Sequence, residues 1–274
     1  MKKYLFIFIV FLVACDVPVT LDERQTEPVL VIEGQLTDIS ALNYVKLSTT
    51  APFYAEGTTP TITDGIVTIS EDGGALYPFL HNPGNHADSS GFYKPAVPLT
   101  GKVGKSYALS VLYKGIEYTA QDLMPASNTI DSLGYRINPW ELSHHSDSGK
   151  VYELLLYAQE PQDVSNYYLF RFYRNDSIVR AYENDIYIAE DVALGERIAG
   201  FPSPVYFAKK DTAVVHILNV SRYSFIYYLD LQMALNNDGG LFGPPPANPH
   251  TNLSNDALGF FLVASVAADT VVIE

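Results

Sequence analysis

Residues 106–122 read SYALSVLYKGIEYTAQD, and this stretch decides the fold class. Every second residue from Tyr107 to Tyr113 is large and apolar, while its neighbours are smaller or more polar. This period of two is typical of a β-strand with one buried face. Lys114-Gly115 supplies a tight turn before a second strand over 116–122. The stretch therefore predicts an antiparallel hairpin.

Short strands and turns continue on the amino-terminal side of this hairpin. The turn Glu71-Asp72-Gly73-Gly74 separates two strands expected at 65–70 and 75–80. The spacing over residues 27–125 fits an immunoglobulin-like β-sandwich, a fold of about 100 residues. We place a domain boundary next to Pro125.

The pattern restarts over residues 126–274, which we expect to form a second β-rich domain with one helix. The helix is predicted near 221–236, where Ser221 can cap it and apolar residues recur at helical spacing. A long loop rich in Gly, Pro and Asn follows. The strands expected in this half lie at 130–137, 151–159, 166–174, 177–182, 213–219, 259–266 and 270–273, with 267–269 separating the last two.

The first fifteen residues have the pattern of a lipoprotein signal peptide. Lys2-Lys3 precedes an apolar run of eleven residues, and the tetrad Leu12-Val13-Ala14-Cys15 closes it. A transmembrane helix needs about 17–25 such residues, so the run is too short to span a bilayer. We predict cleavage after residue 14, attachment of a diacylglycerol to Cys15, and a tether over residues 15–26.

Composition is consistent with this interpretation and excludes some partners. Cys15 is the only cysteine, so no disulfide can form once it carries lipid. The net charge of the whole chain is −14, and loss of Lys2 and Lys3 makes the mature chain more acidic. Such a surface repels phosphate backbones, so we expect no nucleic-acid partner. Membrane attachment is expected through the N-terminal lipid alone.

Catalytic motifs are sparse. Residues 101–106 read GKVGKS, but Leu99 stands where a phosphate-binding loop requires glycine, and a strand follows instead of a helix. The sequence contains neither a Gly-x-Ser-x-Gly elbow nor a His-Glu-x-x-His motif. We therefore predict no catalytic residues, no cofactor and no enzymatic activity.

Histidine placement leaves one alternative open. Loop histidines without the spacing of a known metal site are usually solvated, and a strand histidine is usually packed and hydrogen-bonded, so no metal site is predicted. A hydrolase site could still assemble if one loop group, His144 and His145 with Asp147, met the other, His86 with Asp88, across a cleft between the halves. The histidines considered are His81 and His86 near Asp88, His144 and His145 beside Asp147, and His216 in the strand 213–219.

Two features are candidate contacts with a partner or ligand. Trp140 lies in a segment, 138–148, that we expect to be irregular and exposed, and tryptophan is a frequent interface anchor. Pro244, Pro245 and Pro246 hold an extended backbone with little entropy to lose on binding. A loop packed on its own domain is the alternative for the prolines, and core packing accounts for most other aromatic residues.

Four stretches together resemble a known family. They are the lipobox, the stretch 27–34 (EPVLVIEG), the stretch 130–133 (IDSL), and FGPPPANP at 242–249 leading to TNL at 251–253 and GFF at 259–261. In this order they are similar to an uncharacterised family of Bacteroidota outer-membrane lipoproteins, classed as domain of unknown function 4249 and often encoded beside a TonB-dependent receptor. One departure is Ser254–Leu258, where the family usually has a glycine-rich lead.

The resemblance implies a location and a partner class but no reaction. We expect a lipoprotein of the outer membrane, on its periplasmic or cell-surface face, that acts without catalysis as an accessory to a TonB-dependent receptor. It would capture a nutrient or cap the receptor. The alternatives are an envelope structural or interaction protein without a small-molecule ligand, and the hydrolase described above.

Overall fold

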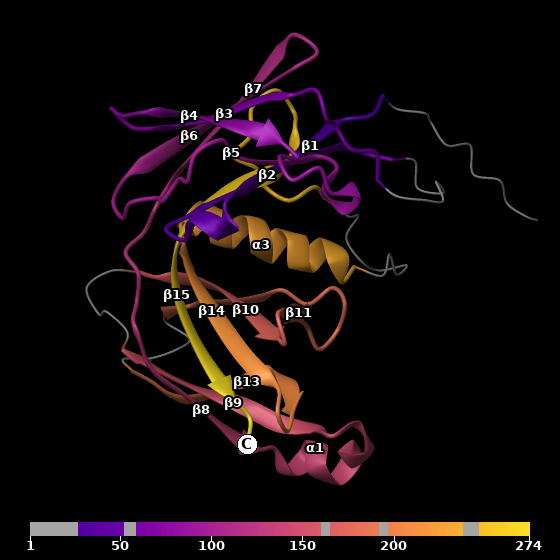
Figure 1. Cartoon of the computed structure of the whole chain (residues 1–274), viewed down its shortest axis with the longest axis vertical. Coiled ribbons are helices and arrows are strands. Elements are labelled where there is room, and N and C mark those ends of the chain that lie inside the picture. Colours follow the sequence, from indigo (N-terminus) through magenta and orange to yellow (C-terminus); the bar gives the residue numbers. More distant parts are fainter. Residues whose placement is uncertain (1–26, 52–58, 160–164, 192–196, 238–246) are drawn as a thin grey trace, which may run out of the picture.

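The structure, a computed structural model, describes residues 27–51, 59–159, 165–191, 197–237 and 247–274. Strands account for 52% and helices for 14% of it, which confirms the predicted mainly β class. The strands form two sheets, and one α-helix, α3, lies against the larger of them (Figure 1). Within these described ranges, no helix is both long and apolar enough to cross a membrane.

The larger sheet has twelve strands. In spatial order they are β11 (Ser177–Val179), β10 (Tyr167–Arg174), β14 (Thr212–Val220), β15 (Leu258–Val272), β1 (Leu30–Thr37), β2 (Tyr44–Thr49), β5 (Phe92–Pro95), β4 (Leu76–His81), β3 (Ile66–Glu71), β6 (Ser106–Tyr113) and β7 (Ile116–Leu123), with β12 (Tyr187–Glu190) also paired to β10. The pair β1 and β15 is parallel, and every other pair is antiparallel.

The smaller sheet and the helices complete the fold. The smaller sheet consists of β13 (Arg197–Ala208), β9 (Lys150–Gln159) and β8 (Ile130–Ile137). The helices are α1 (Pro139–His144) and α3 (Arg222–Leu235), together with the 3-10 turns η1 (Ser40–Leu42), η2 (Ala87–Ser89) and η3 (Ser146–Ser148).

Both predicted hairpins and the predicted long helix are confirmed. In the β6–β7 hairpin Tyr113 pairs with Ile116, and the two turn residues Lys114 and Gly115 have positive φ angles of 49° and 78°. Two such residues give the turn a twist that matches the strands. Ser221 caps α3 as expected, because its hydroxyl accepts a hydrogen bond from the backbone N–H of Ser224 at 3.2 Å.

Two predictions near the ends of strands are wrong. The two strands expected at 259–266 and 270–273 are the single strand β15, because residues 267–269 continue the ladder against β14. No glycine or proline interrupts these residues, so nothing forces the chain to leave the sheet. The strand expected over 177–182 ends at Val179, where the chain leaves β10.

Strand β15 connects the two halves of the chain. It pairs with β14 along one edge and with β1 along the other, so residues from both ends of the chain share one sheet. Its side chains Phe261 and Val263 belong to the hydrophobic core of the amino-terminal half. The division into two domains stays a prediction, and so does the immunoglobulin-like character of residues 27–125. If the chain divides near residue 125, β15 belongs to the carboxy-terminal part by sequence but also pairs with β1 and packs in the core of the amino-terminal part.

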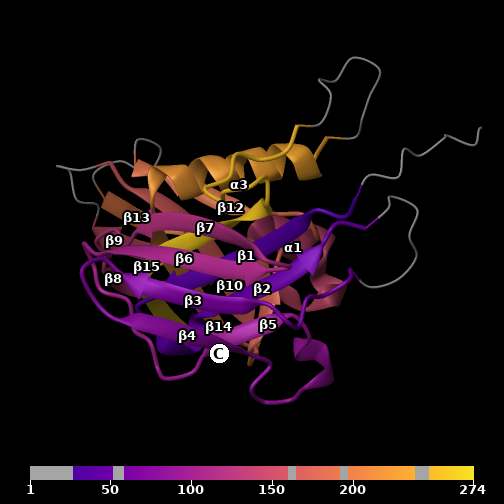
Figure 2. The same cartoon turned by 90° about the horizontal axis from the view of Figure 1, so that it is seen from above.

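The two sheets and α3 enclose three hydrophobic clusters. The first is enclosed by β1 to β7 and part of β15, and for one cluster to contact all of these strands the sheet must curl around it. The second lies between the smaller sheet and one face of β10 and β14, and the third lies under α3 on the opposite face. Seen from above, α3 runs along one side of the molecule (Figure 2).

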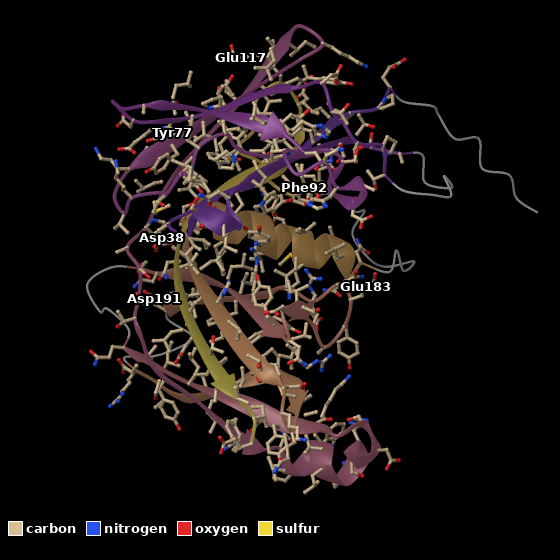
Figure 3. The ribbon with its side chains drawn as sticks, in the orientation of Figure 1. Asp38, Tyr77, Phe92, Glu117, Glu183 and Asp191 are labelled. Atoms are coloured by element: carbon tan, nitrogen blue, oxygen red, sulfur yellow. The ribbon has the colours of Figure 1, made fainter. Side chains whose placement is uncertain are left out.

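Two carboxylates, one buried and one partly buried, join the two halves of the chain. Asp122, at the end of β7, accepts hydrogen bonds from the Ser224 hydroxyl at 2.9 Å and from the backbone N–H of Val263 at 3.1 Å. It therefore links β7, α3 and β15. Asp38, labelled in Figure 3, accepts a hydrogen bond from the backbone N–H of Val266 at 2.9 Å. Burial raises the pKa of both carboxyls, and the hydrogen bonds to backbone N–H groups oppose that rise.

Removing the Asp122 carboxylate should destabilise the protein. In Asp122→Ala the hydroxyl of Ser224 and the N–H of Val263 lose their buried acceptor, which we expect to cost about 3 kcal/mol of unfolding free energy. Urea denaturation measures this loss. Asp122→Asn keeps one acceptor and should cost less. Equal stabilities of the Ala variant and the wild type would contradict the assigned role.

The same carboxyl makes a prediction about pH. Because its pKa is raised above 3.8 in the folded state, the folded chain holds this proton more tightly than the unfolded chain does. The stability that Asp122 contributes therefore falls as pH rises from 3.8 through the raised pKa. Asp122→Asn cannot titrate, so the difference in unfolding free energy between wild type and this variant should shrink as the pH rises above 3.8.

Candidate functional site

A pocket of about 210 Å³ opens on the face of the large sheet that contacts α3, which we call the α3 face. Glu33 on β1 pairs with Phe260 of β15 and therefore shares its face, and Arg171 shares a face with Leu169 two residues before it on β10. Tyr228 reaches the pocket from α3. Residues far apart in sequence thus meet at one place.

A gap in the sheet edge forms the floor of this pocket. The outer edge of β10 pairs with β12 up to Phe170 and with β11 from Phe172 onward. Arg171 lies between these two ladders, and on its other side it pairs with His216 of β14. The chain leaves β10 at Val179 and returns at Tyr187, so the segment between them forms a wall of the pocket.

Charges of both signs and phenol groups line the pocket. Glu33 pairs with Lys46 at 2.9 Å, and its side chain is 46% exposed. Arg171 donates a hydrogen bond to the Tyr228 hydroxyl; burial raises the pKa of Tyr228, and the Arg171 charge opposes that rise. Burial likewise raises the pKa of Tyr44 to about 12. The phenols therefore stay neutral and can act as hydrogen-bond donors or acceptors.

His216 extends the polar surface beside Arg171. Its ring lies 4.8 Å from the ring of Tyr173, which agrees with the expected packed side chain. The expected hydrogen bond is missing, because buried Nδ1 has no partner among the described residues. Burial, and then the charge of Arg171, lowers the pKa of His216, so the ring is neutral at physiological pH. The arrangement suits binding of a small polar ligand by hydrogen bonds.

Trp140 lies on the short helix α1, which corrects the prediction of an irregular segment. Asn138 caps the helix by accepting hydrogen bonds from the backbone N–H groups of Trp140 and Glu141, and proline occupies the first helical position. The indole is 55% exposed and stacks on His144 at 4.6 Å. The helix thus holds Trp140 at the surface in a fixed orientation, as the prediction of an exposed anchor requires.

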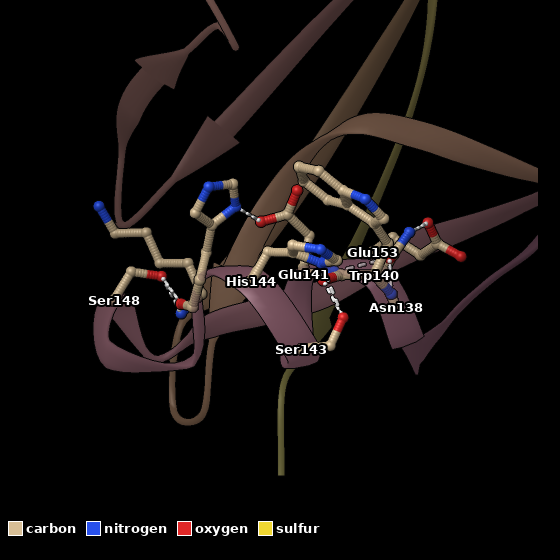
Figure 4. A network of polar contacts seen from close by, with 9 residues as sticks. Asn138, Trp140, Glu141, Ser143, His144, Ser148 and Glu153 are labelled. Carbon is tan, nitrogen blue, oxygen red and sulfur yellow. Dashed lines mark hydrogen bonds and ion pairs between the residues drawn. The ribbon is translucent and has the colours of Figure 1, made fainter.

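Two buried carboxylates, Glu141 of α1 and Glu153 of β9, take part in the polar network around α1 (Figure 4). Glu141 lies 2.8 Å from Nδ1 of His145. Glu153 on β9 accepts hydrogen bonds from Arg136 and Asn138, both at 2.6 Å. Each carboxylate is thereby satisfied within the protein. The Asn138–Glu153 contact ties the start of α1 to the smaller sheet, and the Glu141–His145 contact closes the end of the helix on itself.

The loop histidines lie in separate settings. His81 accepts a hydrogen bond from the backbone N–H of Gly91 at 3.1 Å and packs on Tyr93, whereas His86 is exposed in its turn. His144 and His145 contact Trp140. In the described part of the chain, no three His, Cys, Asp or Glu side chains gather in a way that could hold a metal ion.

Other predicted site residues lie outside the described residues. These are Cys15 and the three prolines Pro244, Pro245 and Pro246. Sequence reasoning missed Glu33, Tyr44, Arg171 and Tyr228. One signal was available for Arg171, because it is a charge in the middle of the aromatic strand 167–174, whereas the second arginine, Arg174, stands at the strand's end.

The chain belongs to the family described as Domain of unknown function (DUF4249), which matches residues 16–270. The match begins directly after Cys15 and covers nearly all of the rest of the chain. It confirms the family resemblance carried by the sequence motifs. No curated protein matches the chain.

Proposed function

We propose that this protein is an outer-membrane lipoprotein that acts without catalysis as an accessory to a TonB-dependent receptor. It captures a nutrient for the receptor or caps it. One observation carries the proposal, namely the lipobox ending at Cys15 directly before a family domain that starts at residue 16. This order suits a folded domain held to a membrane by a lipid on its first residue.

The pocket on the α3 face supports a role in binding. It offers Glu33, Arg171 and neutral phenols on rigid strands and a helix, which favours recognition of a small polar molecule. Trp140, held by α1, offers an exposed aromatic anchor for a partner. An envelope interaction protein without a small-molecule ligand would need only the exposed Trp140 and not the pocket.

Pull-down with the tagged full chain tests the partnership. We expect stoichiometric recovery of a TonB-dependent receptor, and we expect Trp140→Ala to weaken this recovery about tenfold or more if the indole is an anchor. Tyr223→Ala is the matched control, because Tyr223 is a 75% exposed aromatic residue on α3. Recovery without any receptor would contradict the proposal.

The prolines provide a second test of the same interface. Replacing Pro244-Pro245-Pro246 with Gly-Ser-Gly should weaken receptor recovery with little change in melting temperature if the loop contacts the receptor. A large loss of stability with unchanged recovery would favour a loop packed on its own domain.

An activity test distinguishes the hydrolase alternative from the proposed non-catalytic accessory. We expect the purified protein to turn over neither glycosides, peptides nor esters, with or without zinc or calcium. Activity that disappears in a folded His144→Ala, His145→Ala variant would replace the accessory proposal with the hydrolase.

A further inference from the structure

A second pocket, of about 290 Å³, lies beside α1 and shares only Val179 and Arg180 with the first. One wall comes from α1 and η3, with Glu141, His145 and Ser148. The opposite wall is the chain that follows β11, and Val205 and Tyr206 of β13 contribute apolar surface. We call it the α1 pocket.

Basic side chains converge on the α1 pocket. Lys150 starts β9, Arg174 ends β10, and Arg180 follows β11, so three separate elements each bring one cation to it. In a chain with 17 basic and 31 acidic residues, such convergence is a local reversal of the overall charge.

The nearby carboxylates do not neutralise these cations. Glu141 is engaged by His145, and Glu153 by Arg136. Over the described residues, none of Lys150, Arg174 and Arg180 forms an ion pair with an acidic side chain. Arg174 is held by donating a hydrogen bond to the backbone carbonyl of Tyr206 at 3.2 Å. Its remaining donors, and those of the other two cations, are available to an anion.

We propose that the α1 pocket binds the carboxylate group of a small organic ligand. Lys150, Arg174 and Arg180 supply charge-assisted hydrogen bonds to the carboxylate oxygens. Val205 and the ring of Tyr206 contact the body of the ligand, and the volume of about 290 Å³ has room for a molecule of about the size of one sugar ring. This inference goes beyond the proposed function. It names a class of ligand that the chain binds by itself, so it can be tested on the purified chain without any receptor.

Trp140 provides a direct reporter for this pocket. It is the only tryptophan in the chain, and its ring lies 5.0 Å from the ring of His145, which lines the pocket. Tryptophan fluorescence therefore reports on this region alone. Isothermal titration calorimetry gives an independent binding constant where the fluorescence does not change.

The experiment titrates the full chain, purified in detergent, with glucuronate, glucose and inorganic phosphate. We expect glucuronate to bind at least about tenfold more tightly than glucose, as one charge-assisted hydrogen bond provides. Its affinity should fall as sodium chloride is added. Equal affinity for the acid and the neutral sugar would overturn the proposal, and binding of phosphate without glucuronate would overturn the assignment to a carboxylate.

Matched variants locate the binding. Lys150→Gln, at a residue that lines only this pocket, should weaken glucuronate binding about tenfold, and so should Arg180→Gln, at a residue that lines both pockets. Lys105→Gln removes the same charge from an exposed position in the amino-terminal half and should leave binding unchanged. Both pocket cations are exposed, so these variants should fold normally, which circular dichroism checks. Equal effects of all three variants would show that binding follows net charge and not this pocket.

Discussion

The Cys15→Ser variant is expected to incorporate no labelled palmitate and to keep its signal peptide. The diacylglycerol is joined to a thiol, and Cys15 is the only thiol in the chain, so no other residue can accept it. Cleavage follows lipid attachment, so the variant should also migrate as the longer, unprocessed form. Metabolic labelling and mass spectrometry of the purified protein measure both effects.

A neighbouring substitution controls for the change of sequence. Asp16→Asn alters the next residue but keeps the thiol, so labelling should match that of the wild type. Labelled palmitate in Cys15→Ser would contradict the prediction. Recovery of the wild type only from inner-membrane fractions would contradict the proposed outer-membrane location while leaving lipidation intact.

The Gly259→Ala variant is expected to lose about 4 kcal/mol or more of unfolding free energy. Gly259 has a φ of +97°, and a Cβ there would lie 2.1 Å from the carbonyl oxygen of Ile32. Ile32 and Gly259 are paired in the parallel ladder between β1 and β15, so neither backbone can yield without separating the strands. Urea denaturation should show the loss.

A second glycine separates strain from crowding. Gly104 also has a positive φ, +78°, but nothing lies within 4 Å of the position of its Cβ. Gly104→Ala should therefore cost only the backbone strain, about 1–2 kcal/mol. If both variants lost the same stability, the close approach of β1 and β15 at Gly259 would not be the cause.

Local signals in the sequence predicted the local structure. The turn at Lys114-Gly115 and the alternation before it define the β6–β7 hairpin, and Ser221 marks the start of α3. The helix α1 was missed although Asn138 and Pro139 form a recognisable start, because six residues are too few to show helical periodicity. The continuation of β15 through 267–269 was also missed, although these residues contain neither glycine nor proline.

Long-range contacts could not be predicted in the same way. The parallel pairing of β1 with β15 joins residues more than 220 positions apart, and nothing in either strand specifies its partner. The pocket on the α3 face depends on that pairing, since it brings Glu33 across the sheet toward Arg171. Trp140 was predicted as a contact because tryptophan is a frequent interface anchor and its segment was expected to be irregular and exposed, without knowledge of its neighbours.

The pairing of β1 with β15 also sets the order in which the chain can fold. A ribosome releases the amino-terminal half first, yet its core includes Leu253, Ala257 and Phe261, which are synthesised near the end. Loop closure over such a separation is slow. We therefore expect the first half to keep apolar surface exposed until the last strand arrives, a state that favours aggregation.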